Sequence, residues 1–159
     1  MSVTLNGSGQ TIVQVQSVAS AVPFTATGTA NTYYPFTGLS ITITPSSASN
    51  KLLLIANLSS GTNANGTQYF SFVRGSTAVG IGSGGTNNMT QGFYPANTSS
   101  YNQAGIGMTY LDSPATTSAT TYYIQVATDS GGTIYFNRRQ ADTSFGMVSS
   151  FTVMEISGT

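Results

Sequence analysis

The 159-residue chain contains no cysteine, no histidine and no tryptophan, and it carries only four basic and four acidic residues. The absence of cysteine excludes disulfide bonds and thiolate metal sites. The absence of histidine removes the usual general base of enzymes and the commonest neutral metal ligand. We therefore expect a protein that is not an enzyme and has no catalytic residues, no cofactor and no metal site.

Charge is both scarce and balanced. Charged residues make up 5% of the chain, against about 25% in an ordinary soluble domain, and the formal net charge is zero. Without a basic excess, neither nucleic acid nor an anionic membrane surface is an expected partner. The N-terminus has no basic segment and no long apolar run, so we expect no signal peptide and no membrane span. A surface with so little charge is poorly protected against association, and we expect neighbouring copies to cover much of it.

Short apolar segments alternate with turn residues along the whole chain, and no stretch keeps a helical period. Residues 11–18 and 39–44 alternate polar and apolar side chains, as half-buried strands do. The pattern predicts an all-β chain, an antiparallel β-sandwich or jelly roll of about eight to ten strands. We expect an N-terminal arm over residues 1–10 and a single domain over residues 11–159.

Turn residues between strand segments predict three hairpins. These pair residues 39–44 with 51–58, residues 69–74 with 78–81 around Gly75-Ser76, and residues 121–127 with 133–137.

Three strand segments are apolar on both faces: residues 52–55, residues 122–124 and residues 151–156. One face of each can fill the core of a sandwich, but the other face needs a second cover. Without helices to supply that cover, a neighbouring subunit is the natural one. The alternative is that some apolar side chains simply lie exposed, which is common. The side chains predicted at the subunit interface are Leu53, Ile55, Tyr123, Phe151 and Val153.

Two patterns could indicate chemistry, and we interpret both as structural. Asp112 and Asp129 could form the carboxylate pair of a polysaccharide hydrolase, but each follows a strand in a turn sequence, where it would cap backbone amides. Gly80–Gly85 (GIGSGG) matches the dinucleotide-binding pattern. That pattern needs a following helix and a carboxylate about 20 residues later, and neither is expected here. We predict a loop.

Arg138 and Arg139 are the only adjacent charges. Beside Tyr135 and Phe136 they could contact a nucleic acid or a sugar. We favour a solvated strand end with a salt bridge to Asp142.

Several segments, taken in order, carry a resemblance. They are residues 38–51 (GLSITITPSSASNK), 52–55 (LLLI), 74–77 (RGST), 111–114 (LDSP), 121–123 (TYY) and 152–156 (TVMEI). Together they resemble a family of virion structural proteins from tailed bacteriophages, especially phages of cyanobacteria and other aquatic bacteria. The resemblance implies a jelly roll of the tumour-necrosis-factor and C1q type, packed as a homotrimer, in a virion assembled in the bacterial cytoplasm.

The resemblance leaves two positions on the virion open. The first is a capsid decoration or cement protein, favoured because only about ten residues precede the first predicted strand. Its arm would contact the major capsid protein or other virion proteins through Val3 and Leu5. The second is a receptor-binding tail-fibre or spike domain that contacts host glycans through Phe93, Tyr94 and Tyr101.

Overall fold

The computed structural model describes residues 4–5, 9–63, 66–94 and 103–157, and the side chains of Thr4, Leu5 and Gln10 are outside this description. The described residues form twelve strands. They are β1 (Thr4–Leu5), β2 (Gln10–Ser20), β3 (Phe24–Gly28), β4 (Tyr34–Ile43), β5 (Lys51–Thr62), β6 (Gln68–Arg74), β7 (Thr77–Val79), β8 (Gln91–Phe93), β9 (Ala104–Asp112), β10 (Thr120–Thr128), β11 (Gly132–Phe136) and β12 (Ser149–Ile156). No helix among the described residues is long and apolar enough to cross a membrane.

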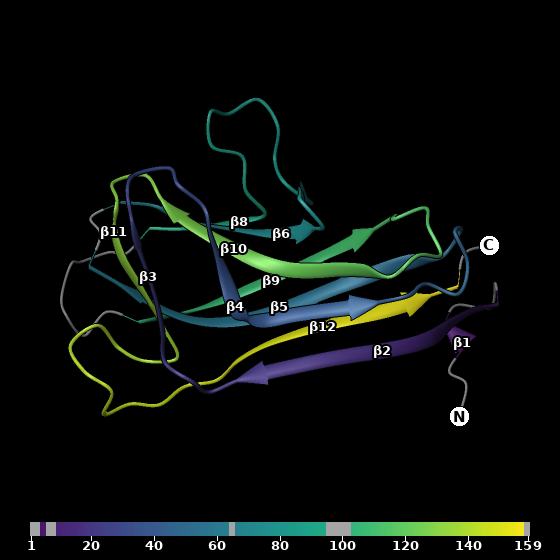
Figure 1. Ribbon diagram of the computed structural model, residues 1–159, viewed down its shortest axis with the longest axis horizontal. Coiled ribbons are helices and arrows are strands. Elements are labelled where there is room, and N and C mark those ends of the chain that lie inside the picture. The colour runs from purple at the N-terminus through teal and green to yellow at the C-terminus, as the bar shows by residue number, and fades with distance from the viewer. Residues whose placement is uncertain (1–3, 6–8, 64–65, 95–102, 158–159) are drawn as a thin grey trace.

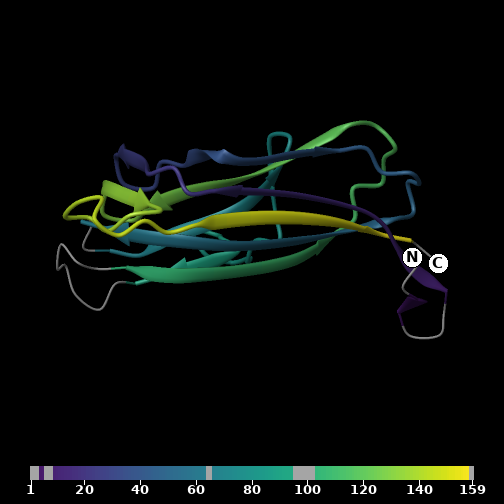
Figure 2. The same cartoon turned by 90° about the horizontal axis from the view of Figure 1, so that it is seen from below.

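The strands lie in two antiparallel sheets that face each other, as Figures 1 and 2 show. The large sheet has the order β1-β2-β12-β5-β11-β3, with β9 on the other side of β5. The small sheet has the order β4-β10-β6-β7, with β8 also paired to β6. The predicted all-β sandwich is confirmed. The strand count exceeds the prediction because β1, β3 and β8 were not predicted; β1 and β8 have only two and three residues.

The core lies between the sheets and is built by the period-2 alternation of the strands. In β5, Leu52, Leu54 and Leu58 point inward and are at most 2% exposed. At one end, four phenylalanines from both sheets meet. The ring centroids of Phe36 and Phe136 are 4.3 Å apart, Phe24 lies 5.1 Å from Phe36, and Phe70 lies 6.4 Å from Phe136.

One of the three predicted hairpins is present, and two are wrong. β6 and β7 pair around Gly75, whose φ of 60° suits a tight turn. The strand β4 pairs with β10 instead of β5, and β11 pairs with β3 and β5 instead of β10. Both connections cross from one sheet to the other. Such a crossing gives the same apolar alternation as a hairpin, because both strands bury one face in the same core.

The loop between β7 and β8, residues 80–90, projects from the sandwich (Figure 1). Hydrogen bonds hold it in place: the Tyr33 hydroxyl donates to the Asn88 carbonyl (3.2 Å) and the Asn87 amide donates to the Tyr69 hydroxyl (3.2 Å). No helix follows the glycine pattern within it, in keeping with the predicted loop.

The N-terminal arm and the single-domain boundary stay predictions. Within the expected arm, the backbone of Thr4 and Leu5 pairs with Thr11 and Gln10 at the start of β2.

Candidate functional site

The five side chains predicted at a subunit interface lie in three different places. Leu53 and Ile55 are partly exposed and point away from the core on β5, and Tyr123 is partly exposed on the outer side of β10. Phe151 and Val153 are 0% exposed and belong to the core, so the prediction for these two is wrong. β12 alternates, and its outward side chains are those of Thr152, Met154 and Ile156.

The outer face of the large sheet carries an apolar row that we name the outer row: Val15, Met154, Leu53 and Leu111. These residues are direct cross-strand partners on β2, β12, β5 and β9, so their side chains lie side by side on one face. Val15 and Leu111 are each 50% exposed. The row is continuous across four strands, and sequence reasoning found only one of its members, Leu53.

Further apolar side chains extend the outer row on both sides. Val13, 43% exposed, lies two residues from Val15, and Ile55 lies two residues from Leu53. Among the described outward side chains of these four strands, the only charged one is that of Lys51, whose Nζ donates to the Ser113 hydroxyl at 2.7 Å. The row itself is apolar with Lys51 at its border, and hydroxyl groups lie beside it on the same face, where those of Ser17 and Thr152 are 2.9 Å apart.

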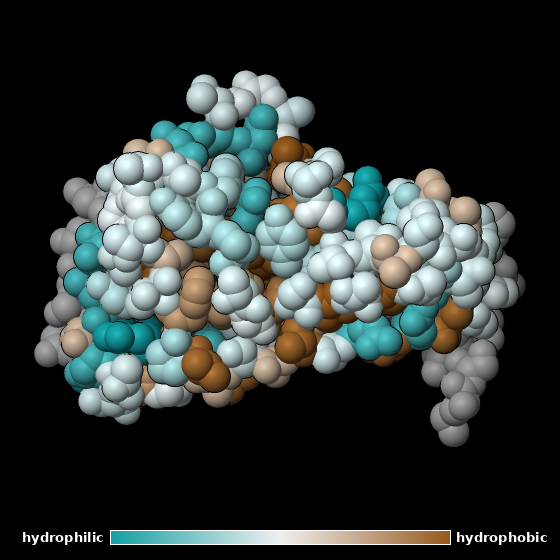
Figure 3. All heavy atoms as spheres, viewed as in Figure 1, coloured by the Kyte–Doolittle hydropathy of each residue, from teal (hydrophilic) through white to brown (hydrophobic). Residues whose placement is uncertain are grey.

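The described outer face of the small sheet carries hydroxyl groups without such an apolar row, and most of the residues seen on it are of intermediate hydropathy (Figure 3). The Thr42 and Thr121 hydroxyls hydrogen bond across β4 and β10 at 2.8 Å. Tyr123 lies opposite Ser40 on the same two strands. The two outer faces of the sandwich thus have different chemistry, and Tyr123 does not share a surface with Leu53 and Ile55.

The other predicted contact residues do not form a described cluster. Val3, Tyr101 and the side chain of Leu5 lie outside the described residues. Phe93 is partly buried in β8 and packs against the core, whereas the neighbouring Tyr94 is 60% exposed.

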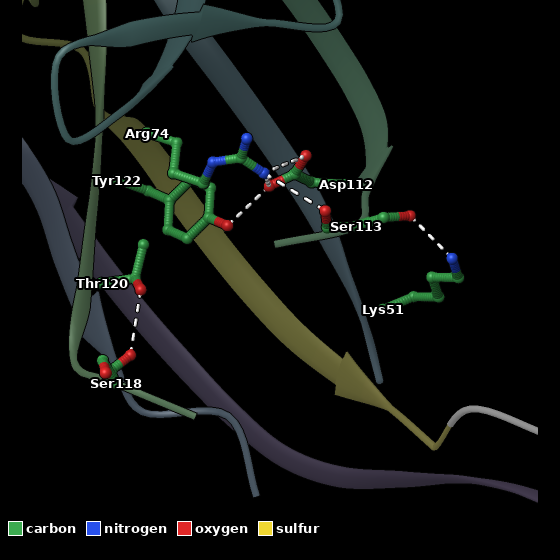
Figure 4. Close-up of polar contacts among 7 residues, drawn as sticks. All are labelled: Lys51, Arg74, Asp112, Ser113, Ser118, Thr120 and Tyr122. Atoms are coloured by element: carbon green, nitrogen blue, oxygen red, sulfur yellow. Dashed lines mark hydrogen bonds and ion pairs between the residues drawn. The ribbon is translucent and has the colours of Figure 1, made fainter. Parts of the chain in front are cut away.

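A charged network joins the two sheets near one end of the sandwich (Figure 4). Arg74 on β6 donates from Nη1 to both carboxylate oxygens of Asp112 on β9, at 2.8 and 3.0 Å. The Tyr122 hydroxyl on β10 donates to the same carboxylate at 2.6 Å. Burial and this hydrogen bond to Asp112 raise the pKa of Tyr122. The tyrosine thus stays protonated and acts as a donor.

This network overturns the interpretation of Asp112 as a turn cap. Asp112 is the last residue of β9 and is 4% exposed. Asp129 does lie in an exposed turn, but it follows the opposite end of β10 from Tyr122, the partner of Asp112. Seven residue steps along the strand separate Tyr122 from Asp129, about 23 Å at the rise of a β-strand. Carboxylate pairs in glycosidases are about 5–9.5 Å apart, so these two cannot form one.

The network borders an open groove of about 690 Å³ between the 80–90 loop and the ends of β6, β7 and β9. Its walls include Arg74, Thr77, Ile81, Tyr110 and Asp112. Sequence reasoning missed this groove because its walls come from two separate segments, residues 74–90 and 110–113, and only the fold brings them together. The signal in the sequence that could have pointed to the groove is Arg74, the single charge directly after the apolar segment 69–73.

A second buried carboxylate, Glu155, is 0% exposed at the end of β12. It accepts hydrogen bonds from the Gln14 amide (2.6 Å), the Ser46 backbone N–H (2.7 Å), the Ser46 hydroxyl (2.9 Å) and the Asn50 amide. Burial alone would raise the pKa of Glu155, but these donors outweigh it and lower the pKa below its ordinary value. Through the bonds from Ser46 and Asn50, the carboxylate holds the loop between β4 and β5 against β12.

The predicted salt bridge between Arg139 and Asp142 is confirmed, with Nη2 and Oδ2 2.7 Å apart. Hydrogen bonds from Arg139 lower the pKa of Asp142. The two arginines also stack on aromatic rings: Arg138 lies 5.1 Å from the Tyr135 centroid and Arg139 lies 4.5 Å from the Phe145 centroid. Among the described residues, no three acidic side chains gather in a group that could hold a metal ion.

No known protein family and no curated protein sequence matches the chain. The fold is similar to that of a chain in the structure of infectious bursal disease virus Gx strain. The TM-score is 0.46, and the identity is 10% over 92% of this chain and 41% of that one. A similar likeness links it to infectious bursal virus-derived T=1 particles, with a TM-score of 0.45, 9% identity and coverages of 92% and 39%. The C-terminal CBM6 of LamC, a marine laminarinase from Zobellia galactanivorans, gives a TM-score of 0.33 and 11% identity over 89% and 99%. The chain thus spans about two fifths of the viral chains, and its function has to be argued from its own residues.

Proposed function

We propose that this chain is a non-enzymatic structural protein of a virus particle whose copies associate through the outer row. The observation that carries the proposal is the continuous apolar strip of Val15, Met154, Leu53 and Leu111, whose two end members are each 50% exposed. Complete burial of such a side chain contributes about 1.5–3 kcal/mol. Since these side chains are already partly covered, each would add about half of that on association.

A second copy is the partner that fits this surface best. A partner must supply apolar surface and needs no compensating charge, because Lys51 at the border is the face's only described charged side chain. Another copy's outer row meets both conditions. The chain's low charge also leaves little repulsion between copies, because the net charge is zero. The resemblance to phage virion proteins favours three copies in the assembly.

The position on the particle that we propose is the capsid surface, as a decoration or cement protein that contacts the major capsid protein. This follows the resemblance to tailed-phage virion proteins noted in residues 38–55 and 111–123. The second candidate is a receptor-binding domain of a tail fibre or spike. Cryo-electron microscopy of the particle distinguishes them: density for the sandwich on the head supports decoration, and density confined to the tail supports the second candidate.

The role of the outer row is tested by placing a charge within it. Val15→Asp and Leu111→Asp change half-exposed side chains, so each monomer should keep its fold, checked by far-UV circular dichroism. We expect size-exclusion chromatography with light scattering to give a multiple of 16.4 kDa for the wild type and 16.4 kDa for both variants. Val22→Asp is the matched control, because Val22 is 71% exposed and lies in the turn after β2. If both variants keep the wild-type mass, copies do not associate through this face.

A further inference from the structure

We propose that the groove between the 80–90 loop and β9 is a binding site for a neutral saccharide. This inference is independent of association through the outer row, which lies on another surface of the sandwich. The volume of the groove, about 690 Å³, is within the range of about 300–1,000 Å³ usual for ligand sites.

The donors and acceptors of the groove come from the ion pair at its wall. Arg74 contacts Asp112 and the Ser113 carbonyl through Nη1, and its side chain is 30% exposed. Figure 4 shows its outer nitrogen turned away from Asp112. Nη2 and Nε take no part in the contacts with Asp112 and the Ser113 carbonyl. They are available to donate to ligand oxygens.

The charge balance of the groove selects a neutral ligand. Arg74 and Asp112 are its only described charged wall residues, and they compensate each other at 2.8 Å. An anion would compete with the Asp112 carboxylate for the same guanidinium, whereas sugar hydroxyls accept from the remaining N–H groups without displacing it. The guanidinium holds these donors in a fixed plane, which suits neighbouring hydroxyls of a pyranose.

The remaining walls match the mixed surface of a sugar ring. Ile81 is 40% exposed, and Met89 and Tyr110 are partly exposed, so they offer apolar surface for C–H groups. The exposed side chains of Thr77 and Ser113 add hydroxyls at the rim. Apolar contact together with a few fixed polar groups is the usual make-up of a small-molecule site.

The groove is formed before any ligand binds. Gly80 has a φ of 63° and lies directly on the Tyr110 ring, where an added Cβ would be 2.5 Å from Cγ. The Gly82 N–H donates to the Met89 carbonyl at 3.1 Å and closes the base of the loop. Together with the bonds to Tyr33 and Tyr69, these contacts fix the wall, so little ordering is needed on binding.

The test is a screen of the purified wild-type chain on an array of neutral oligosaccharides built from glucose, galactose, mannose and N-acetylglucosamine, with sialylated and sulfated oligosaccharides on the same array. We expect binding to at least one neutral series, confirmed by isothermal titration calorimetry. Arg74→Lys retains the ion pair but removes the free guanidinium donors, and we expect it to weaken binding at least tenfold. Arg138→Lys is the conservative control outside the groove, with unchanged affinity expected.

A second variant keeps the test decisive if Arg74→Lys unfolds. Thr77→Phe fills the groove from an exposed rim position and should abolish binding, while Thr25→Phe, at an exposed position on β3, should leave it unchanged. The proposal is overturned if no neutral oligosaccharide binds, if only the anionic ones bind, or if Thr77→Phe binds as tightly as the wild type.

Discussion

At the scale of single residues, Glu155 explains a wrong prediction. Glu155 shares its face of β12 with Phe151 and Val153, and a carboxylate on that face suggests that it points to solvent. The opposite face, with Met154 and Ile156, looks equally suitable for the core. The donors on Gln14 and Ser46 hold Glu155 in this orientation, and they come from segments more than 100 positions away. The alternation of β12 was predictable from sequence, but its inward face was not.

Replacing Glu155 with glutamine should lower stability at neutral pH by about 1–3 kcal/mol, because a glutamine amide places a donor among the donors that now contact the carboxylate. The low pKa of Glu155 also fixes the pH dependence. Its contribution is complete above the ordinary glutamate pKa of 4.5 and is lost as pH falls through the lower folded-state pKa. Urea unfolding at a series of pH values should therefore show a smaller loss of stability in acid for the variant than for the wild type.

Gln16→Glu is the control for this prediction, since it adds a carboxylate at an exposed position of β2 and should leave the acid sensitivity of the wild type unchanged. Equal acid sensitivity of Glu155→Gln and the wild type would contradict the assigned role of the buried carboxylate.

At the scale of elements, strand segments were predictable and their partners were not. The pair β6 and β7 follows from Gly75, which marks a local turn. The loop between β4 and β5 has turn residues too, but it crosses between the sheets because Ser46 and Asn50 bind Glu155. Likewise, Arg74 meets Tyr122 through the register of β6 and β10, which no local pattern encodes. Long-range hydrogen bonds and register are thus what the sequence pattern left undetermined.

The aromatic cluster that joins the sheets gives an element-scale prediction. Phe136 on β11 is 0% exposed and stacks 4.3 Å from Phe36 on β4. Phe136→Ala should lower the free energy of unfolding by about 3–5 kcal/mol through lost apolar contact and the cavity left behind. Phe145→Ala removes the same side chain where it is 55% exposed, and we expect a loss below about 1 kcal/mol. Comparable losses in denaturant titrations of the two variants would contradict the position given to the cluster.

At the scale of the whole molecule, the absence of charge and the outer row lead to the same conclusion. One outer sheet face carries the continuous apolar row of Val15, Met154, Leu53 and Leu111. A protein with a net charge of zero and such a face is suited to contact with copies of itself. Strands apolar on both sides predict self-association, and we propose the outer row as the surface for it.

Sedimentation velocity of the wild-type chain over a dilution series tests this central claim most directly. We predict a species whose mass is a multiple of 16.4 kDa, three times that value if the resemblance to trimeric phage proteins extends to the assembly, dissociating only on dilution. A single species of 16.4 kDa at every concentration would contradict the account.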